Sequence, residues 1–397
     1  MKDDRMSGMD EIRMEELEGE GCLALRSLWE EVFYEDSREF TEYYFQEKAV
    51  RNHAFVLRDR EGRVVSMLYL APYPMMLRVG EDFQTAEINY IIGVATKKEY
   101  RHRGYMDRLL RAALRYMYEK KQPFSFLMPA NPLIYQPYQF SYIYAKKKLG
   151  LCRPVSEELV AQEELSGPEG LSALADFASD FLAQNCDAFI RRDAAYYSVM
   201  EKELAAQRGG ICLLRGEEGI EGYFLYTREE AQTRIQEAVL KKGVRNCLVE
   251  TGAVADPVIM ARVVDVQALL SLLRTESGEV SFAMEIKDPL LKENDGLWEC
   301  WITPSAAGIR RGDAGRRQGE SGLACRLPIC SIAVENLISW IFGYRPAEEC
   351  FEFLKVPGRE EAGAELRAAE GSEEAAALLR KLGRLKIFKK VFINEIV

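Results

Sequence analysis

Histidine is nearly absent from this sequence, which contains only His53 and His102 among 397 residues. Ser-His-Asp triads, Cys-His pairs and polyhistidine metal sites all need histidine, so these classes of site are nearly excluded. Any acid and base chemistry must therefore come from tyrosine, aspartate, glutamate, lysine, cysteine or a chain terminus.

Cysteine pairs and long apolar runs are also missing. The nine cysteines are scattered, odd in number and lack any C-x-x-C pair, which favours reduced thiols over a disulfide framework or a zinc site, and we expect no metal. No apolar run approaches the roughly 18 to 20 residues that span a bilayer. The first twenty residues are charged and do not resemble a secretory signal. These absences predict a cytoplasmic protein.

The overall composition is that of a soluble globular protein with more than one domain. Apolar residues make up 48% of the chain and charged residues 29%, which is enough apolar material for several cores. The net charge of −10 disfavours nucleic acid and an anionic membrane and mildly favours cationic partners. We therefore expect neither nucleic acid nor a membrane as a partner.

Apolar periodicity divides the chain into three regions, at 1–150, 151–285 and 286–397. The first alternates strand and helix patterns, which predicts an α+β fold with a mixed sheet. The elements expected there are a strand at 11–16, helices at 19–33 and 37–48, a hairpin at 53–78, a strand at 84–95, a helix at 104–121 and strands at 124–128 and 142–149.

The second and third regions carry weaker patterns. The second repeats the first, with expected helices at 171–185 and 193–207 and strands at 210–215, 222–227 and 233–240. In the third, we expect helices at 331–341 and 372–382. The alternating segment LKIFKKVFINEIV near residue 397 predicts a strand, with the intervening GDAGRRQGESG as a hairpin tip or an exposed loop.

Residues 92–110, IGVATKKEYRHRGYMDRLL, form the most informative segment, because they predict a strand, a short basic loop and an amphipathic helix. Unpaired N–H groups at a helix start favour an anion. Arg101 and Arg103 add positive charge there, and Gly104 has no Cβ to hold a phosphate away. A solvated turn explains the same residues without a ligand. In the second region, the corresponding segment NCLVETGAVADPVIM has no R-x-x-G.

The sequence R-H-R-G-Y-M between that strand and helix resembles the acetyl-CoA motif of the GNAT acetyltransferases, R/Q-x-x-G-x-G/A. Together with NPLIYQPYQFSYIY and the three-part layout, it is similar to the enhanced intracellular survival (Eis) group. The resemblance implies an active GNAT domain at 1–150, a degenerate GNAT-like domain at 151–285 and a sterol-carrier-protein-like α/β domain at 286–397. It also implies a homo-oligomer, by analogy a hexamer.

The same resemblance implies acetyl-CoA as co-substrate and assigns residues to it. The backbone of Ile92, Gly93 and Val94 would pair with the pantetheine arm, and Ala130 and Asn131 would lie near the thioester. The pyrophosphate would be held by Arg101, His102, Arg103, Gly104, Tyr105 and Met106. Met106 departs from the Gly or Ala that usually ends the motif.

Acetyl transfer to an amine needs a base for the ammonium proton and an acid for the departing thiolate. The resemblance assigns the acid to Tyr135 and the base to the main-chain carboxylate of Val397. A phenol with a pKa of about 10 can donate to a thiolate whose own pKa is about 8.5. Aromatic packing for Tyr135 and a frayed end for Val397 are the alternatives.

The implied activity is N-acetylation of an amine-bearing, cationic small molecule, such as an aminoglycoside or a polyamine. Phe33, Glu35 and Asp36 are the candidate substrate residues, because acids and aromatic faces suit an ammonium group, although helix packing explains the neighbouring aromatics equally well. A carrier of a lipid or other apolar ligand and a CoA-binding sensor without turnover remain open. The acceptor's identity does not follow from the sequence.

Overall fold

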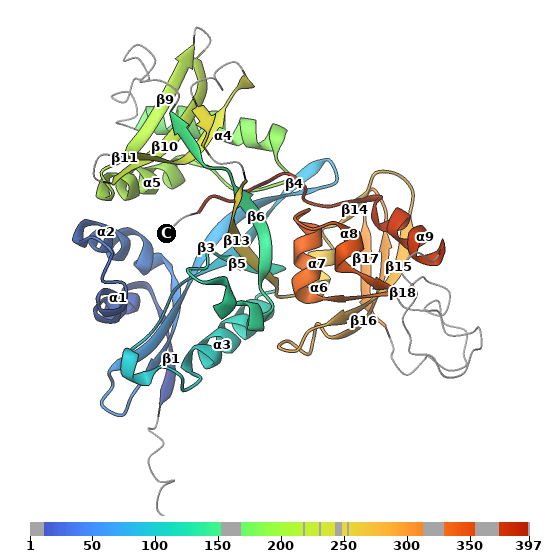
Figure 1. The fold of residues 1–397 in the computed structure, drawn as a ribbon, viewed down its shortest axis with the longest axis horizontal. Helices are drawn as coiled ribbons and strands as arrows, with labels where there is room; N and C mark the ends of the chain where they lie inside the picture. Colours follow the sequence, from blue (N-terminus) through green and yellow to red (C-terminus); the bar gives the residue numbers. More distant parts are fainter. Residues whose placement is uncertain are drawn as a thin grey trace, which may run out of the picture.

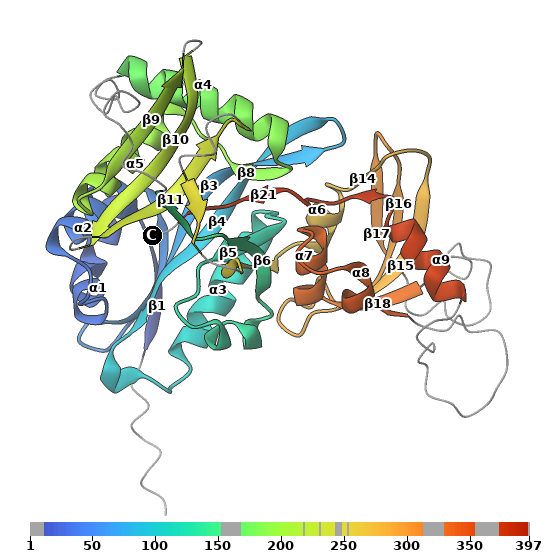
Figure 2. The ribbon, with the colours of Figure 1, turned by 45° about the horizontal axis from the view of Figure 1, so that its top comes forward.

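The computed structural model describes residues 12–151, 168–216, 219–229, 232–242, 248–251, 254–312, 329–353 and 373–395. Its elements gather into three lobes, with the first in the centre (Figure 1). The second lobe lies at one end of the first, and the third lies at its side (Figures 1 and 2). None of the described helices is long and apolar enough to cross a membrane.

The first lobe is built on a nine-stranded mixed sheet. Two long strands, β3 and β4, form an antiparallel hairpin at its centre, and only the β4–β5 and β21–β8 pairs are parallel among its described strands. The order is β1 (Arg13–Glu18), β2 (His53–Arg58), β3 (Val64–Val79), β4 (Asp82–Thr96), β5 (Phe124–Leu127), β13 (Asp256–Val263) and β6 (Ser141–Lys146); β8 (Ala188–Ile190) pairs with the far end of β3, and β21 (Val391–Phe392) pairs with β8.

Helices cover both faces of this sheet because consecutive side chains of its central strands are buried, so both of its faces must be shielded from water. Helix α3 (Tyr105–Glu119) buries one stripe at helical spacing, Leu109, Leu110, Ala113, Leu114 and Met117, against one face. The opposite face is covered by α1 (Arg26–Val32), α2 (Arg38–Tyr43) and a π-helical turn at Tyr44–Lys48, preceded by a 3₁₀ segment at Gly19–Leu25.

Strand β13 lies in the first lobe although the expected division places its residues in the second region. It pairs antiparallel with β5 on one side, with Met260 opposite Leu127, and with β6 on the other. Its inner half, from Ile259 to Val263, is buried. Strands β5 and β6, which are neighbours in the sequence, are therefore separated by a strand from far along the chain.

The second lobe is a three-stranded antiparallel sheet covered by two helices. Its strands are β9 (Gly210–Gly216), β10 (Gly219–Glu229) and β11 (Gln232–Leu240), and its helices are α4 (Pro168–Asn185) and α5 (Ala194–Ala206). Leu174, Tyr197 and Tyr223 lie in its core. The helices and strands expected at 171–240 are all present, with ends shifted by a few residues.

The third lobe is a five-stranded sheet with helices. The sheet order is β17 (Ala307–Arg311), β16 (Gly296–Ile302), β15 (Val280–Lys287), β18 (Ile329–Ala333) and β19 (Glu352–Phe353), and the helices are α6 (Val266–Leu270), α7 (Val334–Ile341), α8 (Ala347–Cys350) and α9 (Glu373–Leu382). The helix expected at 331–341 begins only at Val334, because Ser331 to Ala333 extend β18 parallel to β15. The loop GDAGRRQGESG lies mostly outside the described residues.

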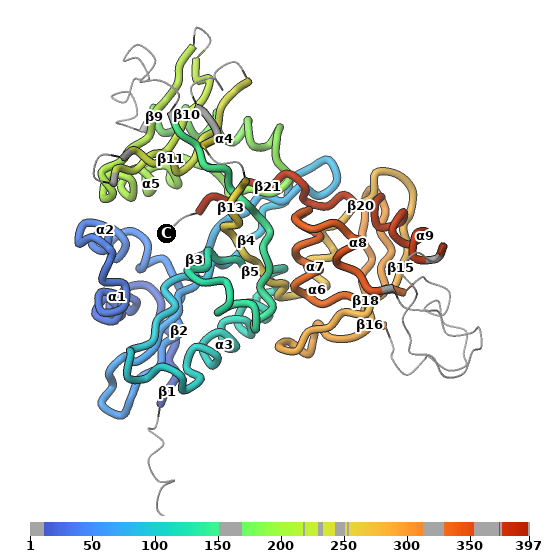
Figure 3. The backbone as a smooth tube through the Cα atoms, in the orientation of Figure 1, coloured from blue at the N-terminus to red at the C-terminus, as the bar shows by residue number. Residues whose placement is uncertain are grey.

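Two short strand pairs lie outside the three main sheets. Strand β7 (Leu149–Leu151) pairs with β12 (Leu248–Glu250), and β14 (Arg274–Thr275) pairs with β20 (Leu385–Lys386). The last described segment leaves the third lobe and runs between the first and second lobes (Figure 3). Of the strand expected there, residues 385–386 and 391–392 are the ones that form ladder pairs within the part that the structure describes, up to Glu395.

Candidate active site

The loop between β4 and α3 folds tightly because two of its residues adopt left-handed backbone conformations. His102 has φ 62° and Gly104 has φ 77°. Gly104 is also the N-cap of α3, and no side chain caps this helix. A Cβ built on Gly104 would meet no heavy atom within 4 Å, so the space at the start of α3 is open. Uncapped N–H groups facing open space are a suitable setting for an anion.

The charged residues of this loop are held by its own backbone. Arg101 Nε donates to the Thr96 carbonyl at 3.1 Å, and an Arg103 Nη donates to the Glu99 carbonyl at 3.0 Å. The Arg103 guanidinium also lies 5.1 Å from the ring centre of Tyr100. Asp107, the acid in the first turn of α3, is paired with Arg111 at 2.9 Å, which offsets its repulsion of an anion.

A β-bulge lies in β4 just before the loop. Met67 of β3 pairs with Ala95, but Tyr69 pairs with Ile92, so β4 has one extra residue around Gly93. Strand β4 pairs with β5 at Tyr90 and Phe126, and no further ladder pair between the two strands follows within the described residues. The backbone from Ile92 to Val94 therefore lies where β4 and β5 have separated, which leaves it available to an extended ligand.

The segment after β5 exposes apolar side chains. Met128, Leu133 and Ile134 have relative exposures of 36%, 67% and 44%. Asn131, predicted to contact acetyl-CoA, uses its side-chain oxygen to cap a 3₁₀ turn at Pro132–Ile134, accepting from the Leu133 N–H at 3.0 Å. Ala130 immediately precedes it. An apolar ligand arm would cover exposed surface of this kind.

Tyr135 lies between two 3₁₀ turns, Pro132–Ile134 and Gln136–Tyr138, and packs in the same apolar cluster as Val94 and Met106. Its ring meets Phe140 edge-on at 5.9 Å. Burial raises the pKa of Tyr135 to about 12. Within the described residues, its hydroxyl has no hydrogen-bond partner. The structure thus brings Tyr135 together with residues of the bulge and the loop.

Two of the three candidate substrate residues contact Trp29, on the face of the sheet that α1 and α2 cover. We call it the acceptor face, after the predicted role of these residues. Asp36 accepts a hydrogen bond from Trp29 Nε1 at 2.9 Å, and burial raises the pKa of Asp36. The Phe33 ring lies 4.7 Å from that of Trp29. Glu35 is exposed. Asp36 and Phe33 therefore share a neighbour, and Trp29 itself contacts the bulge.

A buried polar cluster beside this face was not predicted. Lys48 Nζ, in the π-helical turn, lies 3.1 Å from Glu203 Oε2 of α5 and donates to the Tyr73 hydroxyl at 3.3 Å. The Tyr43 hydroxyl donates to the same Glu203 oxygen at 2.7 Å. Only the π-turn hints at function, since such turns often lie at functional sites. Glu203 is too distant in sequence to be paired with Lys48 by pattern.

Tyr90 is a second residue that the sequence did not single out. Its hydroxyl accepts from the Met128 N–H at 3.2 Å, and so bridges β4 to the chain leaving β5. Burial raises its pKa, with smaller raising effects from Tyr73, Glu395 and Tyr135. Tyr90 therefore lies within electrostatic reach of both the predicted acid and the last described residues of the chain.

Val397, the other predicted catalytic residue, lies outside the described residues. The segment before it is well placed to reach the first lobe, since β21 lies parallel to β8, which pairs with the far end of β3. Burial raises the pKa of Tyr73, Lys48 lowers it, and the charge of Glu395 raises it, so Glu395 lies near Tyr73.

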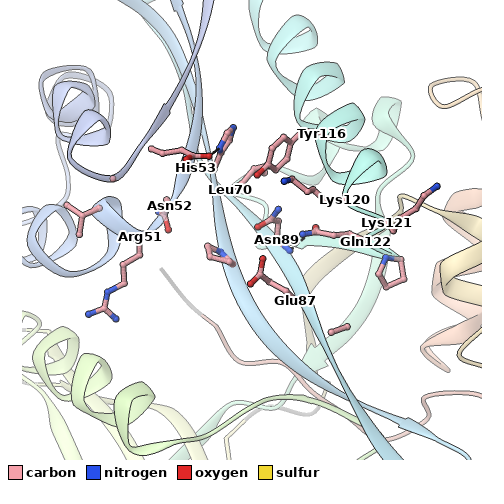
Figure 4. A pocket seen from close by; sticks show the side chains of 16 residues that line it. Arg51, Asn52, His53, Leu70, Glu87, Asn89, Tyr116, Lys120, Lys121 and Gln122 are labelled. Atoms are coloured by element: carbon pink, nitrogen blue, oxygen red, sulfur yellow. Dashed lines mark hydrogen bonds and ion pairs between the residues drawn. The ribbon is translucent and has the colours of Figure 1, made fainter.

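A cavity of about 630 Å³ lies away from these residues, at the C-terminal end of α3 (Figure 4). Its lining includes His53, whose ring stacks on Tyr116 at 4.3 Å, and the buried amides of Asn89 and Gln122. A smaller cavity of about 290 Å³, lined in part by Lys97 and Arg103, lies beside the loop. Neither contains Tyr135. Among the described residues, no three His, Cys, Asp or Glu side chains cluster as metal ligands would.

Residues 14–143 match the family model of the acetyltransferase (GNAT) domain. The match covers about a third of the chain, including the bulge, the loop and Tyr135, and supports an acetyltransferase. Among curated proteins, none matches the sequence significantly.

Solved structures resemble the whole chain at low sequence identity. A probable N-acyltransferase from Enterococcus faecalis is 14% identical with a TM-score of 0.70, covering 98% of this chain and 100% of its own. A GCN5-related N-acetyltransferase from Anabaena variabilis is 16% identical with a TM-score of 0.64, covering 97% and 100%. Eis1 from Mycobacterium abscessus is 12% identical with a TM-score of 0.65, also covering 97% and 100%. At these identities the likeness concerns the fold.

Proposed function

We propose that this acetyltransferase moves the acetyl group of acetyl-CoA to an amine of a cationic small molecule, with Tyr135 as the general acid. The observation that carries the proposal is the Tyr135 hydroxyl, which has no hydrogen-bond partner among the described residues and shares an apolar cluster with Val94 and Met106. The loop Arg101–Met106 and the separated backbone at Ile92–Val94 support acetyl-CoA as the co-substrate. Ala130 and Asn131 belong to the chain segment that leads from β5 to Tyr135.

The raised pKa of Tyr135 suits an acid more than a base, because the phenol stays protonated throughout the physiological range. Transfer to a free thiolate with a pKa of about 8.5 would be uphill. A thiol beside Tyr135 would share its desolvated surroundings, which raise the pKa of any group that becomes negative on losing its proton. We therefore propose that Tyr135 donates a hydrogen bond to the sulfur and passes its proton as the carbon–sulfur bond breaks.

The acceptor is proposed to be an aminoglycoside or a polyamine-like amine. Asp36 and the exposed Glu35 supply negative charge, and Phe33 supplies an aromatic edge beside Trp29. An ammonium group gains from both kinds of neighbour. A neutral or anionic acceptor would lack this attraction between opposite charges.

The base is proposed to be the main-chain carboxylate of Val397. What supports it is the course of the chain before it: Val391 and Phe392 pair with β8, and Glu395 accepts a hydrogen bond from Arg192. Extending the chain by a few residues past Val397 would move this carboxylate while leaving every side chain intact. Turnover should fall and CoA affinity should stay; unchanged turnover would remove Val397 from the mechanism.

We also propose that the second lobe is a degenerate GNAT-like domain and the third a sterol-carrier-protein-like domain, in a homo-oligomer that by analogy is a hexamer. Two helices against a three-stranded sheet support the first assignment, and helices beside a five-stranded sheet support the second. Size-exclusion chromatography with light scattering measures the oligomer directly. A monomer would contradict that part.

Thiol release tests the activity. Purified protein is mixed with acetyl-CoA and a panel of aminoglycosides, polyamines and neutral amines, and free CoA is followed with a thiol reagent. Release should depend on the cationic amines. CoA binding without release for any amine would favour a sensor, and no CoA affinity would favour a carrier of an apolar ligand.

Gly104→Ala provides the matched test of the loop, with Gly62→Ala in the β2–β3 turn as control. Both glycines have positive φ and open space around a Cβ, so both variants carry the same backbone strain of about 1–2 kcal/mol. Only Gly104→Ala should weaken CoA binding in calorimetry. Equal affinities in the two variants would show that the loop does not hold the pyrophosphate.

A further inference from the structure

Arg192 is fully buried and holds two carboxylates. It lies between β8 and α5 with no exposed surface. One Nη donates to Glu395 Oε1 at 2.8 Å, and the other donates to Glu237 Oε2 at 2.8 Å. Glu237 belongs to β11 of the second lobe, whereas Glu395 is the last residue that the structure describes. One guanidinium therefore joins the second lobe to the end of the described chain.

Residues around Arg192 also contact Glu395 and the residues just before it. The guanidinium lies 4.2 Å from the ring centre of Tyr196 and 5.7 Å from that of Phe392. The Tyr196 hydroxyl donates to Glu395 at 3.2 Å. Asn394 Nδ2 donates to the Gln236 carbonyl at 2.6 Å. Phe392, Asn394 and Glu395 are each held by the second lobe.

The charges in this cluster require an arginine. The two buried carboxylates, Glu237 and Glu395, repel each other. The planar guanidinium of arginine has several N–H donors and can donate to both of them at the same time. Burial alone would lower the pKa of Arg192, but Glu237 and Glu395 raise it well above its ordinary value. Lysine carries its three donors on one nitrogen, so it could not reach both carboxylates at the positions where the two Nη groups of Arg192 hold them.

We propose that Arg192 is a positioning residue that holds residues 391–395 between the first two lobes and so directs the chain toward the acceptor face. The catalytic consequence rests on the proposed function, whereas the docking itself does not. Holding residues 391–395 would be a function of the second lobe that does not require the R-x-x-G motif, which this lobe lacks. Because β8 also pairs with β3, the segment is fixed relative to the sheet that carries Tyr73 and Tyr90.

Hydrogen exchange read by mass spectrometry tests the docking without reference to activity. Arg192→Lys is compared with Arg191→Lys, which changes the adjacent exposed arginine that pairs only with Asp193 among the described residues. Amides of residues 391–395 should exchange about 10- to 100-fold faster in Arg192→Lys, the factor expected from one or two lost charge-assisted hydrogen bonds. Exchange at the wild-type rate would overturn the proposal.

Kinetics on the same variants test the consequence. Arg192→Lys should lower kcat and raise KM for the amine while KM for acetyl-CoA stays constant, since the phosphate loop is untouched. Arg191→Lys should match wild type. Faster exchange with unchanged kinetics would overturn the catalytic part alone. If the wild-type protein acetylates nothing, the proposed function fails and the exchange result still decides the docking.

A variant that changes Arg192 alone could unfold, so a second variant removes every charge of the cluster together. Arg192→Met combined with Glu237→Gln and Glu395→Gln leaves no unpaired charge, so the lobe keeps its fold more readily than with Arg192→Met alone. Exchange at residues 391–395 should still be faster than in wild type, because the fork is gone. Wild-type exchange in this triple variant would mean that packing of Phe392 alone holds the segment, and would overturn the role of Arg192.

Discussion

The indole of Trp29 leaves no room for a side chain at Gly93. A Cβ on Gly93 would lie 2.7 Å from Trp29 Cζ3 and 2.9 Å from Tyr69 Cδ2, and Gly93 also has φ 61°. The same Trp29 donates to Asp36. One aromatic side chain thus links the β4 bulge, where acetyl-CoA is proposed to bind, to a residue proposed to bind the acceptor.

Gly93→Ala should destabilise the protein for two reasons. The left-handed conformation costs about 1–2 kcal/mol for a residue with a Cβ, and overpacking against Trp29 and Tyr69 costs about 1–3 kcal/mol more. Gly62→Ala is the control, because it has φ 79° and open space, and should show only the first cost. Urea denaturation measures both. Equal losses would mean that Trp29 moves aside freely.

The first region of the fold followed closely from the sequence because its signals are local. The basic loop and the stripe from Leu109 to Met117 predict the start and the buried face of α3, and both are present. The sequence predicted that the Gly93 backbone binds acetyl-CoA. It could not predict the close approach of Trp29 to Gly93, because that approach depends on how the chain packs. Strand β13 was not placed in this sheet, because its partners in β5 lie more than a hundred residues away.

The polar clusters could not be predicted for a related reason. Lys48 and Glu203, like Arg192 and Glu395, are ordinary charged residues in their local sequence, and only the fold brings each pair together. Tyr135 is different, because a family motif singles it out. Its raised pKa still required the structure, since burial is a property of the packed chain.

Glu203→Gln should cost about 3–5 kcal/mol of unfolding free energy, because it leaves the Lys48 ammonium buried without its carboxylate. Adding Lys48→Met should restore part of the loss. Glu47→Gln is the control: Glu47 pairs with Lys202 at 2.6 Å between the same two elements, but at the surface, so its loss should stay below about 1 kcal/mol. A double-mutant cycle in urea gives the coupling; similar losses for the two glutamates would contradict the difference in burial.

Lys146 should make stability depend on pH. Burial lowers its pKa from 10.5 to about 8. Between these values the unfolded chain keeps a proton that the folded protein has released, so the free energy of unfolding should rise with pH, by at most about 1.4 kcal/mol per pH unit for one proton. Below pH 8 both states are protonated and this dependence disappears.

Urea midpoints at pH 7.5 and 9.5 measure that effect. Lys146→Met should remove the Lys146 contribution to the rise, whereas Lys148→Met, at a lysine with a 68% exposed side chain two positions on, should keep it. The same rise in all three proteins would assign the pH dependence to other groups.

The most direct test of Tyr135 as the general acid compares the acetyl-CoA turnover of Tyr135→Phe with that of Tyr138→Phe. Tyr138 lies in the adjacent 3₁₀ turn, and its hydroxyl is hydrogen-bonded to Asp107 rather than left without a partner. Tyr135→Phe should bind CoA as wild type does and lower kcat by about 10²- to 10⁴-fold, the usual contribution of a general acid. Tyr138→Phe should stay near the wild-type rate. A Tyr135→Phe variant with wild-type kcat would show that Tyr135 is not the general acid.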